Sequence, residues 1–296
     1  MNDQDLLERV ANIRVWRQYD QRAPHKPLLI LCALGRLRNR LNRLVAYSDI
    51  EHTLTELLGL FGRPRRSHHP DDPFKRLPGD NLWELQFPAE LEGRPSTSLN
   101  LTELRKFNVA GGFPQEIYDY LTNRNDLVET IASRLLATNF PTTYHDEIRR
   151  MVGLDVEETT ATTKKNVRDP QFRENVLRAY GRECCVCGSN LRLDNSLFDL
   201  EAAHIMWHSH GGPDEISNGL ALCGFHHKAF DRGAWGLLDS DYSIQVSSEL
   251  NGSGQAMEML LNFEGQNLRL PRKPSLHPNT DYIQWHRREV FRDALA

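Results

Sequence analysis

Apolar residues recur at helical spacing through the first half of the chain. Leu6, Val10 and Ile13 are spaced by three or four residues, and Pro27 stands in the first turn of another such pattern. A further pattern begins at Ser48, a residue type that often caps a helix. This half is predicted to be mainly helical, with helices in residues 5–16, 25–41, 48–61, 111–123 and 125–140 and strand material near residues 81–87.

A polar segment separates this half from the rest. Residues 155–169, DVEETTATTKKNVRD, are rich in threonine and charge and poor in large apolar side chains, which is typical of a linker. We therefore expect a first domain over residues 1–154, a linker over 155–168 and a second domain over 169–296. The second domain is predicted to contain a helix over 168–181 capped by Asp169, a strand over 198–205, a loop over 208–219 and a helix over 222–231. These patterns together predict an α+β protein.

The composition is that of an ordinary soluble protein. The residues are 39% hydrophobic and 26% charged, and a length of 296 residues is enough for two domains with their own cores. The longest apolar run, residues 28–34, is too short to cross a bilayer, and the start MNDQDLLERV lacks the features of a signal peptide. We expect a cytoplasmic protein without a membrane partner.

The net charge of -4 hides a basic cluster near the start of the chain. Between residues 9 and 48, nine basic residues stand against the single acid Asp20: Arg9, Arg14, Arg17, Arg22, Lys26, Arg36, Arg38, Arg40 and Arg43. Such a local excess suits contacts with DNA phosphates, although an exposed helix surface would carry the same residues.

The second half contains a pattern of metal ligands. Cys184 and Cys187 form C-x-x-C, and Cys223 and His226 form C-x-x-H further along. Two such pairs are typical of a closed structural zinc site, whereas small buried residues are the alternative interpretation of the cysteines.

Three polar residues near these ligands remain unassigned: His204, Asn218 and His227. They fall on a predicted strand, loop and helix. Because successive helical side chains diverge by about 100°, His226 and His227 are not expected to bind the same ion.

The segments EAAHI, NGLALC and HHKAFDRG resemble the HNH nucleases of the ββα-metal fold. The resemblance covers roughly residues 172–238 and implies that His204, Asn218 and His227 are the catalytic residues. His204 would be the general base, since a neutral imidazole takes a proton from water at physiological pH. His227 would bind a catalytic Mg²⁺ or Mn²⁺, and Asn218 would hold the His204 loop or orient its imidazole.

One position departs from this family. Many members carry an aspartate as a metal ligand immediately before the first histidine, where this chain has Ala203. The second ligand is therefore open among Glu201, Asn218 and Asp231, and a catalytically inactive zinc module that binds DNA is the alternative.

The segments APHKPLLILCALGRL, DPFKRLPGDNLWEL and AGGFPQEIYDYL resemble the DNA sulfur-binding domain of McrA-like type IV restriction enzymes. The resemblance implies recognition of phosphorothioate, in which sulfur replaces a non-bridging phosphate oxygen. Because sulfur is less strongly hydrated than oxygen, an apolar pocket distinguishes the two, and we expect it at Phe113, Pro114 and Ile117. The alternative is a plain loop with Phe113 in the core.

Basic side chains would contact the DNA around that pocket. Arg76 and the adjacent Lys75 are the preferred candidates, since arginine pairs with both guanine O6 and N7. His25 and Lys26 are further candidates for the DNA backbone.

The sequence thus predicts an endonuclease that binds double-stranded phosphorothioated DNA and cuts nearby. Because one HNH site cuts one strand at a time, we expect a homodimer. The alternatives are an HNH enzyme that recognises methylated cytosine and a non-catalytic, zinc-containing DNA-binding regulator.

Overall fold

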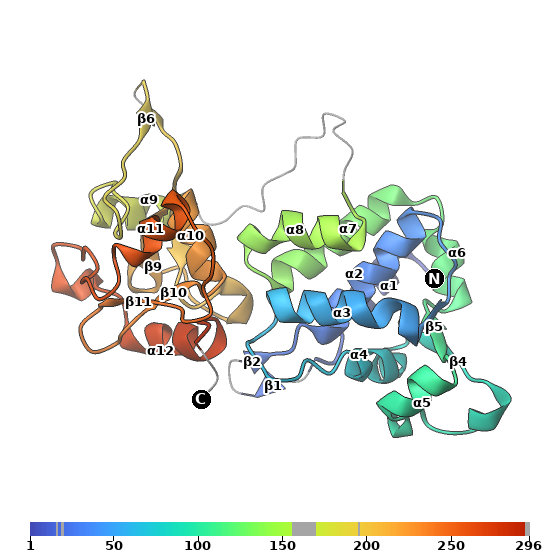
Figure 1. The fold of residues 1–296 in the computed structure, drawn as a ribbon. Coiled ribbons are helices and arrows are strands. Elements are labelled where there is room, and N and C mark those ends of the chain that lie inside the picture. Colours follow the sequence, from blue (N-terminus) through green and yellow to red (C-terminus); the bar gives the residue numbers. More distant parts are fainter. Residues whose placement is uncertain (16, 19–20, 156–169, 195, 294–296) are drawn as a thin grey trace. The chain divides into compact units, whose positions relative to one another are not determined.

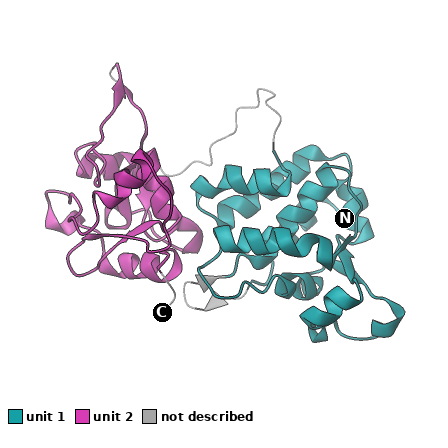
Figure 2. Cartoon of the chain, in the orientation of Figure 1, with its two compact units in different colours: residues 1–160 teal, residues 161–296 magenta. Residues whose placement is uncertain are grey.

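The chain divides into two units, residues 1–160 and 161–296 (Figure 2). The computed structural model describes residues 1–15, 17–18, 21–155, 170–194 and 196–293. Apart from Asp155, the expected linker over residues 155–168 lies outside the described residues. No helix in the described part of the chain is both long and apolar enough to cross a membrane.

The first unit is built around one central helix, α2 (His25–Arg38) (Figure 1). Ten of its residues are buried, from Pro27 to Leu37, because neighbouring helices cover it on several sides. A helix that is apolar all round is stable only in such an environment. Gly35 permits the closest of these approaches, since a Cβ there would lie 1.7 Å from the Val152 carbonyl oxygen.

The described first unit has seven further helices (Figure 1). They are α1 (Asp3–Ala11), α3 (Tyr47–Phe61), α4 (Asp71–Arg76), α5 (Leu101–Lys106), α6 (Gln115–Leu121), α7 (Asn125–Asn139) and α8 (Thr142–Val152). Of these, α3, α4, α7 and α8 contact α2. The helix pattern of residues 5–16 continues past the observed end at Ala11. Helices α4, α5 and α8 were not predicted, because α4 and α5 are too short to show periodicity and α8 is largely polar.

The expected cap of α3 at Ser48 is wrong. The cap position is Ala46, and the Tyr47 amide N–H donates to the Val109 carbonyl oxygen. The helix therefore starts directly from strand β3 (Val45–Ala46), and Ser48 lies in its first turn with its hydroxyl bonded to the Asn108 side chain.

A small antiparallel sheet of order β3-β5-β4 closes the first unit, with β4 at Glu84–Gln86 and β5 at Ala110–Gly112. The two glycines of β5 are required by packing: a Cβ on Gly111 would meet the Trp83 indole, and one on Gly112 would meet the Arg43 carbonyl oxygen. A separate two-stranded ribbon pairs β1 (Arg17–Gln18) with β2 (Gln21–Arg22).

The second unit is organised around the antiparallel hairpin of β8 (Leu200–His204) and β9 (Gly219–Cys223). Helices α9 (Pro170–Ala179) and α10 (Gly224–Asp231) both pack on it. A Cβ on Gly219 would lie 2.4 Å from Val176 of α9, so the glycine lets that helix approach the hairpin. The expected α9 cap, Asp169, lies outside the described residues.

The remaining elements of the described second unit lie before β8 and after α10 in the chain (Figure 1). They are the hairpin β6 (Arg192–Leu193) and β7 (Ser196–Leu197), the hairpin β10 (Trp235–Leu237) and β11 (Ile244–Val246), and helices α11 (Gln255–Leu261) and α12 (Thr280–Glu289). Helix α12 contacts β10 and buries Trp285 and His286. The mixture of helices and small sheets confirms the α+β prediction.

Candidate active site and metal centres

Four side chains of the second unit form a ligand cluster. The ligand atoms of Cys184, Cys187, Cys223 and His226 all lie within 4.8 Å of one another, as the sequence spacing predicts. Hydrogen bonds from the thiols of Cys187 and Cys223 lower the pKa of Cys184, so the cluster favours a thiolate. Three sulfurs and one imidazole at these separations fit a tetrahedral metal ion.

The His226 ring is oriented for such an ion. Its Nε2 lies 3.0 Å from the Met259 carbonyl oxygen, which can only accept a hydrogen bond. The ring proton is therefore on Nε2, and the lone pair of Nδ1 faces the Cys223 sulfur at 3.1 Å. A backbone acceptor on the second nitrogen is the usual arrangement for a metal-binding histidine.

His204, the last residue of β8, is held by two neighbours. Its Nε2 lies 2.7 Å from the Asp214 carboxylate, and its ring stacks on Phe172 of α9 with centroids 4.1 Å apart. The side chain is buried apart from a small exposed edge. When Nε2 carries the proton that is donated to Asp214, the basic lone pair of the ring is on Nδ1.

Asn218 fixes the segment between His204 and Asp214. Its Oδ1 accepts from the Met206 amide N–H at 2.8 Å, and its Nδ2 donates to the carbonyl oxygens of Met206 and Pro213, each at 3.0 Å. The side chain is fully buried. Of the two roles expected for Asn218, these contacts favour holding the loop.

His227 faces away from the cysteine cluster and lies between two carboxylates. Its Nδ1 is 2.6 Å from Glu201 Oε2, and its Nε2 is 3.3 Å from Asp231 Oδ2. Burial disfavours the imidazolium, but the charge of Asp231 and the hydrogen bonds that the ring donates to both carboxylates outweigh this effect and raise the pKa of His227 to about 9. The site therefore attracts positive charge.

The contacts of His227 separate the three candidates for a second metal ligand. The Asn218 side chain is hydrogen-bonded to backbone groups, and Glu201 accepts a hydrogen bond from His227 Nδ1. Asp231, beside His227 Nε2, is therefore the candidate that remains. Neighbouring ligand atoms of an octahedral Mg²⁺, each about 2.1 Å from the ion, lie about 3 Å apart. The observed 3.3 Å fits that arrangement.

Asp231 is itself held in place from the end of β8. The Trp207 indole N–H donates to its other carboxylate oxygen at 3.2 Å. Because Trp207 follows His204 by three residues, the Asp231 side of His227 faces the same end of the hairpin as His204. Asp214 and Trp207 were not identified from the sequence. The one available signal was the position of Asp214, an acid in the Gly-rich loop after the proposed base.

In the first unit, three expected DNA contacts line one pocket of about 620 Å³: His25, Lys26 and Arg76. Arg14, Arg65 and His69 join them there. Arg76 is the expected residue with the most open side chain, 59% exposed and 3.2 Å from Asp72.

The other expected cations are less available. Lys26 contacts Asp80 at 2.5 Å, and Lys75 contacts Asp71 at 2.7 Å. Burial lowers the pKa of His25, which keeps its ring neutral. Of the four expected cations, Arg76 is therefore the one most open to a ligand.

The expected sulfur pocket is largely inside the core. Phe113 and Ile117 are 4% and 1% exposed, and the Phe113 carbonyl oxygen accepts a hydrogen bond from Arg43 at 2.8 Å. Pro114, at the start of α6, is partly exposed. These three residues do not line the pocket that contains Arg76.

Two family models match the chain. The ScoMcrA-like DNA sulfur-binding domain matches residues 3–157, which is more than half of the chain, and an HNH endonuclease domain matches residues 184–238. A search among curated proteins gave no match.

Among solved structures, the chain is similar to the sulfur-binding domain of SprMcrA complexed with phosphorothioated DNA, with 24% identity, a TM-score of 0.45, and 52% of this chain and 95% of that chain covered. The corresponding complex of the ScoMcrA domain has 23% identity and a TM-score of 0.41, with 50% of this chain and 94% of that chain covered. The modification-dependent TagI restriction endonuclease has 29% identity and a TM-score of 0.30, with 42% of this chain and 39% of that chain covered.

Proposed function

Because the chain belongs to the ScoMcrA-like DNA sulfur-binding domain family and its second unit is an HNH endonuclease domain, we propose that it is a type IV restriction endonuclease. The first unit binds phosphorothioated double-stranded DNA, and the second hydrolyses phosphodiester bonds nearby. The observation that carries the nuclease assignment is that strand β8 supports both histidines: His204 at its end pairs with Asp214, and its Glu201 contacts His227, which lies beside Asp231 of α10.

In this proposal His204 is the general base. Asp214 holds the Nε2 proton, so that Nδ1 removes a proton from the attacking water. Phe172 restricts rotation of the ring, and Asn218 keeps the Asp214 loop close to the end of β8.

His227 and Asp231 would hold a Mg²⁺ or Mn²⁺, which supplies charge to stabilise the scissile phosphate in the transition state. Glu201 orients His227 by accepting a hydrogen bond from its Nδ1–H. Two protein ligands suit Mg²⁺, which usually completes its coordination with water and substrate phosphate oxygens.

The cysteine cluster would hold a structural Zn²⁺ through Cys184, Cys187, Cys223 and His226. Cys223 and His226 stand at the end of β9 and in the first turn of α10. A zinc ion there would fix the start of the helix that carries His227.

For the first unit, we assign DNA contact to Arg76, with His25, Lys26 and Lys75 in supporting positions. The apolar contact with sulfur would come from Pro114, which is partly exposed, while Phe113 and Ile117 support it from the core. A linker over residues 155–168 would let cleavage occur at a distance from the modification. We also propose a cytoplasmic homodimer, since double-strand cleavage requires two HNH sites.

Plasmid cleavage tests this function. Phosphorothioated, cytosine-methylated and unmodified plasmids are incubated with the protein and Mg²⁺ or Mn²⁺, and only the phosphorothioated plasmid should be cut. Cleavage of the methylated plasmid instead would support a methylcytosine-dependent enzyme, and cleavage of none would support a regulator.

A matched pair of variants tests the DNA contact. Arg76→Ala should weaken binding to phosphorothioated DNA, whereas Arg134→Ala, which removes an exposed arginine of α7, should bind as the unaltered protein does. Equal effects of the two substitutions would remove Arg76 from the interface.

A further inference from the structure

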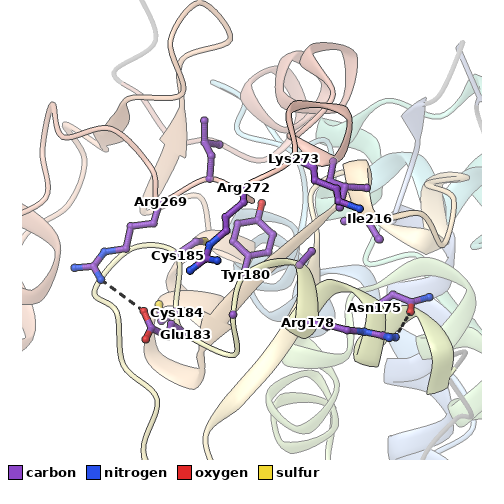
Figure 3. Close-up of a pocket in the computed structure, with 14 residues that line it drawn as sticks. Asn175, Arg178, Tyr180, Glu183, Cys184, Cys185, Ile216, Arg269, Arg272 and Lys273 are labelled. Carbon is purple, nitrogen blue, oxygen red and sulfur yellow. Dashed lines mark hydrogen bonds and ion pairs between the residues drawn. The ribbon is translucent and has the colours of Figure 1, made fainter.

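A basic pocket of about 840 Å³ lies in the second unit (Figure 3). It contains none of the residues assigned above to the base or the catalytic ion, and it borders the cysteine cluster at Cys184. Four cationic side chains line it, Arg178, Arg269, Arg272 and Lys273, with Glu183 as the carboxylate. We propose that this pocket binds the sugar-phosphate backbone of the DNA that the nuclease domain cuts. The proposal rests on the nuclease function above and adds a binding site to it.

The charges of the pocket are largely available to a ligand. Glu183 lies 4.0 Å from Arg269, whereas Arg178 donates to the neutral Asn175 side chain and forms no ion pair with a described residue (Figure 3). Arg272 and Lys273 are exposed, and neither has a carboxylate partner within the described residues. On a protein of net charge -4, such a concentration of positive charge favours a polyanion.

Arg269 is fixed against the cysteine cluster. Its amide N–H donates to the Cys185 carbonyl oxygen at 3.0 Å. Its guanidinium lies over Gly188, where a Cβ would come within 2.3 Å of Arg269 Nη1. Gly188 also has a φ of +75°, so glycine satisfies both the turn and the close approach.

Arg272 and Lys273 are presented by a restrained segment. Pro271 and Pro274 flank them, and the Pro271 carbonyl oxygen accepts a hydrogen bond from His277 Nε2 at 3.0 Å. Because proline fixes φ, less conformational entropy is lost when the two side chains bind a ligand. The pocket is therefore organised before DNA arrives.

The pocket shares two elements with the proposed general base. Helix α9 contributes Phe172 to the His204 stack and Arg178 to the pocket, six residues or about 9 Å further along the helix. Ile216, two residues after Asp214, also lines the pocket. A DNA strand whose scissile phosphate lies near His204 could therefore reach the pocket with a neighbouring part of its backbone.

Salt-dependent binding tests this site. Full-length protein carrying His204→Ala, which keeps the DNA intact, is titrated with phosphorothioated and unmodified duplexes at several salt concentrations. Adding Arg272→Gln should make the slope of log K against log salt shallower by about 0.9, and the Arg272→Gln/Lys273→Gln variant by about twice that. Arg192→Gln, which removes an exposed arginine outside the pocket, should leave the slope unchanged.

The slopes should fall equally on the two duplexes, so that the preference for phosphorothioate is kept. Slopes equal to that of Arg192→Gln would overturn the pocket assignment. A parent protein that binds both duplexes equally would instead contradict the proposed phosphorothioate recognition, while the comparison of slopes would still decide the pocket.

Discussion

Asp214 Oδ1 lies 2.7 Å from His204 Nε2, although the two residues are separated by a Gly-rich loop. The loop returns to the strand because Asn218 bonds to Met206 and Pro213 on either side of it. This pairing gives the proposed base a defined orientation and proton position.

Asp214→Asn should lower the rate of DNA cleavage without changing phosphorothioate binding. The amide keeps the shape of the side chain but loses the charge that stabilises the protonated imidazole. The loss should be smaller than the roughly 10²- to 10⁴-fold expected for His204→Ala. Single-turnover cleavage over a pH series measures it, and an unchanged rate and pH profile in Asp214→Asn would exclude the positioning role.

Asp231→Asn and Glu201→Gln should separate a metal ligand from an orienting group. Asp231→Asn removes a proposed ligand charge and should raise the Mn²⁺ concentration needed for half-maximal cleavage more than Glu201→Gln does. A carboxylate that orients a metal-binding histidine, as proposed for Glu201, typically contributes about 10- to 100-fold in metal affinity. The reverse order in metal titrations would assign Glu201 as the ligand.

Cys184→Ser should remove bound zinc and unfold the second unit. Structural zinc contributes about 10–16 kcal/mol of apparent binding free energy, comparable with the whole stability of a domain. Cys185→Ala is the matched control, because Cys185 is buried beside the cluster but is not one of its ligands. Metal analysis should show zinc retained only in the control; zinc retained in both variants would contradict the ligand assignment.

The second unit should lose stability in acid through His286. Burial lowers the pKa of this histidine to about 4 from an ordinary value of 6.5, so the unfolded chain binds more protons than the folded chain between these values. The free energy of unfolding should therefore fall from pH 7 to pH 4, by about 3 kcal/mol from this group. Denaturant unfolding of wild type and His286→Gln should show a weaker pH dependence in the variant; equal dependence would exclude His286 as the cause.

The local motifs of the second unit could be predicted because their spacing determines their geometry. Neighbouring residues of a helix point in different directions, so His226 and His227 had to face different sites. The partners Asp214 and Trp207 could not be predicted in the same way, since the return of the loop depends on hydrogen bonds made by the buried Asn218.

In the first unit, less of the candidate site could be predicted from the sequence. The GGFP segment indicated a surface pocket, but Phe113 is buried. The segment is held by residues remote in sequence, because Arg43 donates to the Phe113 carbonyl oxygen and Trp83 lies against Gly111. Helix α8 was missed because its apolar residues Tyr144, Ile148 and Val152 are few, and contact with α2 and α3 stabilises it.

The most direct test of the central claim uses two duplexes that differ by a single sulfur. Wild-type protein and His204→Ala are incubated with each duplex and Mn²⁺, and strand cleavage is followed by gel electrophoresis. The account predicts cleavage of the phosphorothioated duplex by the wild type alone. Equal cleavage of both duplexes by the wild type, or undiminished cleavage by His204→Ala, would contradict it.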